Sequence, residues 1–195
     1  MTKIGITGSI GAGKSTASKI LKKHLNAYLF DADKELKTHL FSSISLQNKL
    51  INLFGQEIKG SDSKINSKLL ASIAFKNQAN QKLLNEVLWP EVFILIDEAI
   101  NKAEKNNYKY FIVDAALLLE SGLTDIFDMI VLITASENIR MKRAIERKKI
   151  SLEQIKKRDL LQWSESKKSK NVDLIVKNES TLDAFHKRLI FTLNL

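Results

Sequence analysis

The sequence contains no cysteine and no long uninterrupted apolar run. Without cysteine, disulfide bonds and thiolate metal sites are both excluded. The longest apolar candidate, residues 92–96, stops at Asp97, far short of the ~18 residues that a membrane-spanning helix needs. The chain opens directly into a strand-like segment, with no apolar leader or cleavage site. We therefore expect a soluble, cytoplasmic protein with no membrane contact.

Internal repeats, low-complexity tracts and linkers between independent domains are also missing. The 195 residues, 44% of them hydrophobic, suit one compact α/β domain. The formal net charge of +9 suits a nucleic acid or a polyphosphate substrate, because both are strongly anionic. No nucleic-acid recognition motif is found, which favours a small anionic substrate and no nucleic-acid partner. A nucleic-acid-binding ATPase or regulatory module stays open as the alternative from another class.

Short apolar runs alternate with helical patterns, as in a parallel sheet whose faces are covered by helices. The candidate strands are residues 3–7, 27–30, 110–114, 129–134 and 173–176. Between Asp33 and Asn107 the strand signal disappears, which predicts a helical insertion with a polar loop at residues 55–63. Residues 136–170 are markedly basic. Two helices are expected there, the second beginning near Ser151 at a capping-box pattern.

The strongest motif is G-S-I-G-A-G-K-S at residues 8–15, which fits the phosphate-loop pattern G-x-x-x-x-G-K-[ST]. A predicted strand precedes it and an amphipathic helical pattern follows it, which is the context that this loop requires. The glycines let backbone N–H groups converge on phosphate oxygens, and the helix N-terminus adds its positive dipole end. Lys14 is therefore expected to contact the β- and γ-phosphates, and the Ser15 hydroxyl to bind Mg²⁺.

The phosphate loop does not define the reaction, because GTPases, motor ATPases and small-molecule kinases all use it. A GTPase should also contain an N-K-x-D segment that reads guanine, and the sequence has none. The chain length and the helical insertion favour a small-molecule kinase. At this point a nucleoside, a nucleotide or a sugar acid is still open as the acceptor.

Acidic residues follow two of the predicted strands. Asp114 ends the apolar run Y-F-I-V-D, as in a Walker B element, and is expected to hold Mg²⁺. Asp31 and Asp33 follow the second predicted strand, and strand alternation is expected to turn both carboxylates to one side, near the carboxyl edge of the sheet. One of them could accept the proton of an attacking hydroxyl group. The alternative interpretation is a helix N-cap.

Together these motifs resemble the dephospho-coenzyme A kinase family, in the family's order and spacing over nearly the whole chain. The family's opening G-[GS]-I-G-[SA]-G-K-[ST]-[TS] is found at residues 8–16, and its D-A-D at residues 31–33. Its D-x-P-L-L-x-E segment is similar to residues 114–120. The lid arginines and the late Q-x5-K-x4-D…N pattern correspond to Arg143, Arg147, Gln162, Lys168, Asp173 and Asn178.

The resemblance implies a three-layer P-loop NTPase fold with a five-stranded parallel sheet in the order 2-3-1-4-5. The resemblance also implies that residues 1–195 form a single kinase domain. Within that domain it implies three parts. The core comprises about residues 1–32, 108–136 and 171–195, the helical substrate-binding sub-domain about residues 33–107, and the helical lid about residues 137–170. A monomer or a small homo-oligomer is compatible with it.

The implied reaction transfers the γ-phosphate of ATP to the ribose 3′-hydroxyl of dephospho-coenzyme A, giving coenzyme A and ADP in the final step of coenzyme A biosynthesis. ATP and Mg²⁺ are the implied cofactors, with Ser15 and Asp114 as the metal-binding residues. Asp33 is expected to be the catalytic base, assisted by Lys14 and by Arg143 of the lid. The residues expected to bind the nucleotide are Gly11, Ala12, Gly13, Lys14, Ser15, Thr16 and Arg147.

The residues expected to bind the acceptor substrate are Asp33, Glu120, Trp89 and Lys168. The structural alternatives are a helix N-cap for Asp33, a buried aromatic for Trp89 and a helix-end carboxylate for Glu120. For Arg143 and Arg147 of the lid, the alternative is a solvated helix face. The sequence departs from the family at three positions. Trp89 replaces the histidine of L-H-P, Ala116 replaces the proline of P-L-L, and Ser67 replaces an arginine. These departures concern acceptor contacts rather than the ATP loop.

Overall fold

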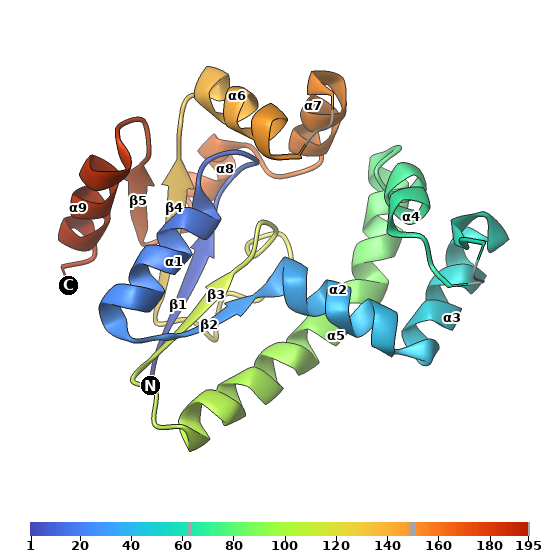
Figure 1. Cartoon of the computed structure of the whole chain (residues 1–195), viewed down its shortest axis with the longest axis horizontal. Coiled ribbons are helices and arrows are strands. Elements are labelled where there is room, and N and C mark those ends of the chain that lie inside the picture. The colour runs from blue at the N-terminus through green and yellow to red at the C-terminus, as the bar shows by residue number, and fades with distance from the viewer. Residues whose placement is uncertain (62–63, 149–150, 195) are drawn as a thin grey trace. The chain divides into compact units, whose positions relative to one another are not determined.

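The computed structural model describes residues 1–61, 64–148 and 151–194, and the chain divides into two compact units (Figure 1). Unit 1 comprises Met1–Asp31 and Glu98–Leu195, and unit 2 comprises Ala32–Asp97. Residues 62–63 of the predicted loop and residues 149–150 of the predicted lid lie outside the described residues.

A five-stranded sheet forms the centre of unit 1. All its strand pairs are parallel, and their order is β2-β3-β1-β4-β5. The strands are β1 (Thr2–Thr7), β2 (Tyr28–Asp31), β3 (Tyr110–Asp114), β4 (Met129–Thr134) and β5 (Leu174–Lys177). Each predicted strand is present, with ends that differ by at most one residue. The predicted α/β class and strand order are therefore confirmed.

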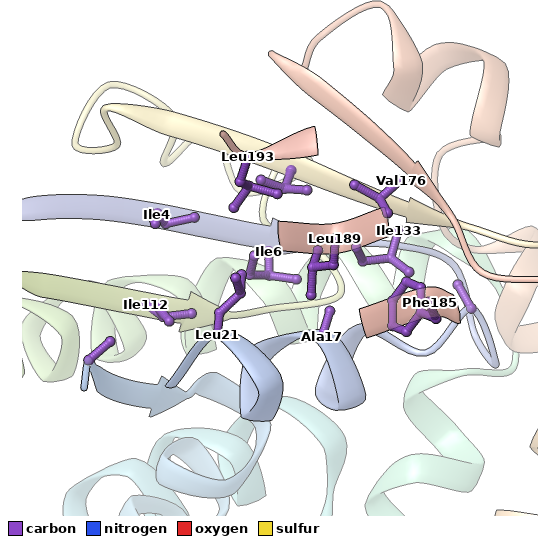
Figure 2. Close-up of a cluster of buried hydrophobic side chains, with 13 residues drawn as sticks. Ile4, Ile6, Ala17, Leu21, Ile112, Ile133, Val176, Phe185, Leu189 and Leu193 are labelled. Atoms are coloured by element: carbon purple, nitrogen blue, oxygen red, sulfur yellow. The ribbon is translucent and has the colours of Figure 1, made fainter. Parts of the chain in front are cut away.

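Helices cover both faces of this sheet. Unit 1 contains α1 (Lys14–Leu25), the end of α5 (Gln78–Lys105), α6 (Glu137–Lys148), α7 (Leu152–Leu160), α8 (Glu165–Ser169) and α9 (Leu182–Thr192). Figure 2 shows Ala17 and Leu21 of α1 and Leu189 of α9 packed against isoleucines of the sheet, in a continuous buried cluster. A second buried cluster contains Leu118, Leu119 and Ile130, with Trp163 packed against it. These clusters hold the sheet and its covering helices together.

The basic segment after β4 contains three helices among its described residues, whereas the sequence predicted two. The unpredicted helix, α8, has only five residues, too few to produce a helical periodicity. The start of α7 was predicted correctly. The Ser151 Oγ accepts a hydrogen bond from the Gln154 main-chain N–H at 3.2 Å, and the Gln154 side chain accepts one from the Ser151 N–H at 3.3 Å. This is the predicted capping box.

Unit 2 is helical, as predicted for this stretch. Its elements are α2 (Ala32–Ser42), α3 (Ile44–Phe54), the 3₁₀ helix η1 (Gln56–Ile58), α4 (Ser67–Ala74) and the first part of α5 (Gln78–Lys105), which continues into unit 1. The predicted loop therefore contains η1, and an isolated antiparallel bridge pairs Lys59 with Ile65. No helix in the described part of the chain is both long and apolar enough to cross a membrane.

Three helices of unit 2 are joined by polar contacts at Glu91 of α5. Its carboxylate is 2.9 Å from the Nε2 of His39 on α2 and accepts a hydrogen bond from the Nζ of Lys49 on α3 at 3.0 Å. The contact with His39 and then that with Lys49 hold the pKa of Glu91 below its usual value. The ionised carboxylate is therefore favoured in the folded unit.

Candidate active site

The phosphate loop connects β1 to α1 at the carboxyl end of the central strand (Figure 1). Because α1 begins at Lys14, the loop leads into a helix N-terminus, where free backbone N–H groups and the helix dipole favour an anion. Lys14 and Ser15 are half-buried in the first turn, and Thr16 is exposed. The local structure is therefore the strand, loop and helix that the motif predicted.

Two loop positions require glycine. Gly11 has φ +80° and Gly13 has φ +100°, in the left-handed region that other residues rarely adopt. A Cβ atom at Gly11 would lie 2.1 Å from the main-chain oxygen of Arg140, and one at Gly13 would lie 2.1 Å from the Nδ2 of Asn178. The same Nδ2 donates a hydrogen bond to the Ala12 carbonyl at 2.8 Å. The loop is thus packed against α6 and against the residue that follows β5.

Lys14 and Asp114 form an ion pair between the Nζ and Oδ1 atoms. Lys14 begins α1, whereas Asp114 ends β3, the strand beside β1. The Asp114 side chain is only 3% exposed. The fold therefore brings the lysine of the phosphate loop and the aspartate predicted to form a Walker B element, 100 residues apart in sequence, into direct contact at the carboxyl edge of the sheet.

Of the two aspartates in D-A-D, Asp31 ends β2 and lies in register with Asp114 of β3. Asp33 belongs to the first turn of α2 and is exposed. Strand alternation, on which the predicted alignment of the two carboxylates was based, does not reach Asp33, because the strand ends at Asp31 and a helix begins at Ala32. Asp33 lies in unit 2, as does the half-buried Trp89 of α5, while the other predicted site residues lie in unit 1.

The arginines of α6 differ in their contacts. Arg143 donates a hydrogen bond from NH1 to the carbonyl of Asn178 at 2.9 Å, and Arg147, one turn further on, is exposed. Sequence reasoning missed Arg140, which is only 8% exposed. Its guanidinium contacts both carboxylate oxygens of Asp159 and the carbonyl of Ile10 in the phosphate loop. No sequence pattern distinguished it from its many cationic neighbours.

Glu120 and Lys168 form a buried ion pair, with Oε1 and Nζ 3.1 Å apart and side chains 8% and 0% exposed. Lys168 also donates to the Ala116 carbonyl at 2.8 Å, and Glu120 accepts the main-chain N–H of Trp163 at 2.8 Å. Burial lowers the pKa of Lys168, and the nearby Glu120 carboxylate opposes that shift. Glu120 lies in the turn that follows β3, so the helix-end alternative for it is wrong.

This arrangement can bind a polyphosphate at the loop and a cation at Asp114. The sequence of the chain also matches a known family. A family model described as Dephospho-CoA kinase (CoaE) matches residues 2–184. The chain belongs to the dephospho-coenzyme A kinase family. Its function is the ATP-dependent phosphorylation of dephospho-coenzyme A, the final step of coenzyme A biosynthesis, and the family and enzyme class predicted from the sequence are confirmed.

Individual relatives agree with this assignment. A protein named dephospho-CoA kinase from Fusobacterium nucleatum subsp. nucleatum is 33% identical over 186 residues, which cover 95% of this chain and 94% of that protein. The structure titled dephospho-CoA kinase from Campylobacter jejuni superposes with a TM-score of 0.66 at 28% identity, covering 98% of this chain and 95% of that one. TT1252 from Thermus thermophilus superposes with a TM-score of 0.82 at 25% identity, covering 99% and 96%.

Proposed function

We propose that this kinase performs its reaction with the residues gathered at the carboxyl edge of the sheet, together with Asp33. The contact between Lys14 and Asp114 supports this proposal most directly, because it joins a phosphate-binding cation to a carboxylate suited to a metal ion. The backbone N–H groups of residues 11–16 would bind the triphosphate of ATP at the start of α1. Lys14 would contact the β- and γ-phosphates.

The side chains of Ser15 and Asp114 fit a Mg²⁺ ion. A hydroxyl and a carboxylate are the hard oxygen donors that Mg²⁺ prefers, and this ion usually takes its remaining ligands from water and substrate phosphates. Bound there, Mg²⁺ would neutralise charge on the β- and γ-phosphates.

The predicted cytoplasmic location and the monomeric or small oligomeric state stay predictions.

In the proposed mechanism Asp33 accepts the proton of the ribose 3′-hydroxyl. The ribose oxygen then forms a bond to the γ-phosphorus, the bond from that phosphorus to the β–γ bridging oxygen breaks, and ADP leaves. Arg143, with Arg147 one turn further along the lid, would neutralise the charge spread over the transferred group. Closure of this basic segment would keep water away from the γ-phosphate.

Three other residues were predicted to bind the acceptor. Because Glu120 and Lys168 are buried and paired with each other, we propose that they act indirectly, by fixing the turn that follows Asp114. A direct contact of the acceptor with Trp89 stays a prediction.

The decisive experiment is phosphoryl transfer from labelled ATP with dephospho-coenzyme A as the only acceptor. Asp33→Asn should lower kcat by about 10²–10⁴-fold, the usual contribution of a general base, with little change in the KM for ATP. Asp31→Asn, two residues earlier, is the matched control and should lower kcat less. Near-normal turnover of Asp33→Asn would show that the base is another residue, and a wild-type enzyme that leaves this acceptor unphosphorylated would refute the function itself.

A further inference from the structure

Arg140 joins three separate segments of unit 1. From the first turn of α6, its NH1 donates hydrogen bonds to the Ile10 carbonyl at 3.1 Å and to the Oδ1 of Asp159 at 2.9 Å. Its NH2 donates to the Oδ2 of Asp159 at 3.1 Å. The pairing with Asp159 of α7 is therefore bidentate, the strong and directional form of an arginine–carboxylate contact. The positive charge of Arg140 is therefore paired within the protein, where α6, α7 and the phosphate loop meet.

The same junction is supported by close packing. Met141, Ala144 and Ile155 form a buried cluster between α6 and α7, and the side chain of Ile10 packs against it. The backbone of Arg140 approaches so closely that only glycine fits at the next loop position, Gly11. The phosphate loop is thus held to α6 through main-chain contact, side-chain packing and a charged hydrogen bond.

The hydrogen bond to Ile10 has a geometric consequence for the next residue. In a planar trans peptide the C=O of one residue and the N–H of the following one point in opposite directions. When Arg140 holds the Ile10 carbonyl, the Gly11 N–H is turned away from the guanidinium. The Ala12 carbonyl is held in the same way by Asn178, which directs the Gly13 N–H. Two alternate peptides of the loop are therefore oriented by side chains from outside it.

We propose that Arg140 and Asp159 act as a positioning pair, in which Asp159 orients the Arg140 guanidinium and Arg140 orients the Gly11 N–H toward the phosphates of ATP. The proposal rests on the proposed phosphate-binding function of the loop. Arg140 is accordingly a positioning residue rather than a phosphate ligand. The pair also links α7, and with it the lid, to the nucleotide loop.

The two roles for Arg140 predict opposite effects of Asp159→Asn on ATP binding. If Arg140 bound phosphate directly, removal of the competing carboxylate charge would strengthen ATP binding. If Asp159 orients Arg140 for the loop, ATP binding should weaken roughly 3–30-fold, as expected when a charge-assisted hydrogen bond is lost. Arg140→Gln should weaken it at least as much, and the double variant should be no worse than Arg140→Gln alone, because the two residues form one unit.

The measurement is the Kd for ATP in the absence of acceptor, which separates this proposal from the phosphoryl-transfer test of the function. Glu153→Gln is the matched control, because Glu153 lies on the same helix as Asp159 and pairs with the exposed Lys157. The Kd of this variant for ATP should equal that of the wild type. Selective ¹⁵N-glycine labelling gives signals from seven glycines. The nucleotide-induced shift of the Gly11 amide should be large in the wild type and reduced in Asp159→Asn.

An unchanged or tighter Kd for Asp159→Asn, with the wild-type Gly11 shift, would overturn the proposal. Thermal melting of each variant checks that it folds. Should Arg140→Gln fail to fold, Arg140→Lys serves instead, since lysine keeps the charge but cannot form the bidentate contact. Arg140→Lys should then show weakened ATP binding with an unchanged KM for dephospho-coenzyme A, and a wild-type Kd for it would count against the pair.

Discussion

Replacing Glu120 by glutamine tests whether the buried Lys168 needs the negative charge of Glu120 for the stability of the fold. Lys168 has no exposed side-chain surface, and its ion-pair partner is Glu120. Glutamine has nearly the same shape and keeps an oxygen that can accept the Trp163 N–H, so the substitution removes mainly the negative charge. Lys168 would then be a buried cation without its counter-charge, which is more costly than the loss of a surface ion pair.

The expected cost is about 3–5 kcal/mol, the range found when one partner of a buried pair is removed. This corresponds to roughly two to four powers of ten in the unfolding equilibrium constant. With a slope of about 2 kcal/mol per molar urea, the unfolding midpoint should fall by about 1.5–2.5 M. Lys168→Met should be similarly destabilising, because it leaves the Glu120 charge buried. The double variant Glu120→Gln/Lys168→Met should recover much of the loss.

Tryptophan fluorescence during urea unfolding can report on unit 1 alone. The chain has two tryptophans, Trp89 in unit 2 and Trp163 in unit 1. A Trp89→Phe background therefore leaves Trp163, whose main-chain N–H contacts Glu120, as the only reporter. Glu153→Gln, which breaks an exposed pair on α7, is the control and should leave the midpoint nearly unchanged.

The reasoning would be refuted if Glu120→Gln moved the midpoint no further than Glu153→Gln does. That result would mean that Lys168 needs no counter-charge. Because burial lowers the pKa of Lys168, a neutral amine in the folded state would be the physical explanation. The additive outcome, in which the double variant loses the sum of both single effects, would equally show that the two side chains do not act as a pair.

Two further predictions concern the loop and unit 2. Gly13→Ala should weaken ATP binding about tenfold or more, because left-handed backbone costs an L residue about 1–2 kcal/mol and the new Cβ would contact Asn178. Gly122→Ala has a similarly positive φ but open space around the Cβ, and should leave the Kd for ATP unchanged. Glu91→Gln should destabilise unit 2 above about pH 4.5, the usual pKa of the carboxyl. Because the folded pKa is lowered, that difference from the wild type should vanish as the pH falls further; a difference independent of pH would contradict the ionic role.

Much of the fold could be predicted because its signals are local. The five strands are short apolar runs that can be recognised without knowing their partners, and the phosphate loop is a dense motif of eight residues. The start of α7 could be predicted for the same reason, since a capping box involves only Ser151 and Gln154. Strand alternation failed at Asp33 because it assumes that the strand continues, and β2 ends two residues earlier.

The parts of the site that escaped prediction depend on distant partners. Arg140 is one cation among many in its segment, and what distinguishes it is Asp159, 19 residues later, together with the Ile10 carbonyl, 130 residues earlier. Lys168 was expected to bind the acceptor, but it pairs with Glu120, and this pairing depends on how the turn after β3 folds back. Periodicity and motif spacing contain no information about such pairings, because these depend on how separate helices and loops pack.

The order of strands in the sheet has a consequence for how the enzyme is made. The central strand β1 pairs with β3 and β4, and Asn178, which holds the phosphate loop, lies 166 residues after its partner Ala12. At a synthesis rate of about 5–20 residues per second, roughly 8–33 s separate the emergence of these two residues. The nucleotide loop is therefore translated well before Asn178, the residue that completes its contacts. A nascent chain that has been translated only as far as β5 therefore contains the complete ATP motif and Arg140, but not the hydrogen bond from Asn178 to the Ala12 carbonyl.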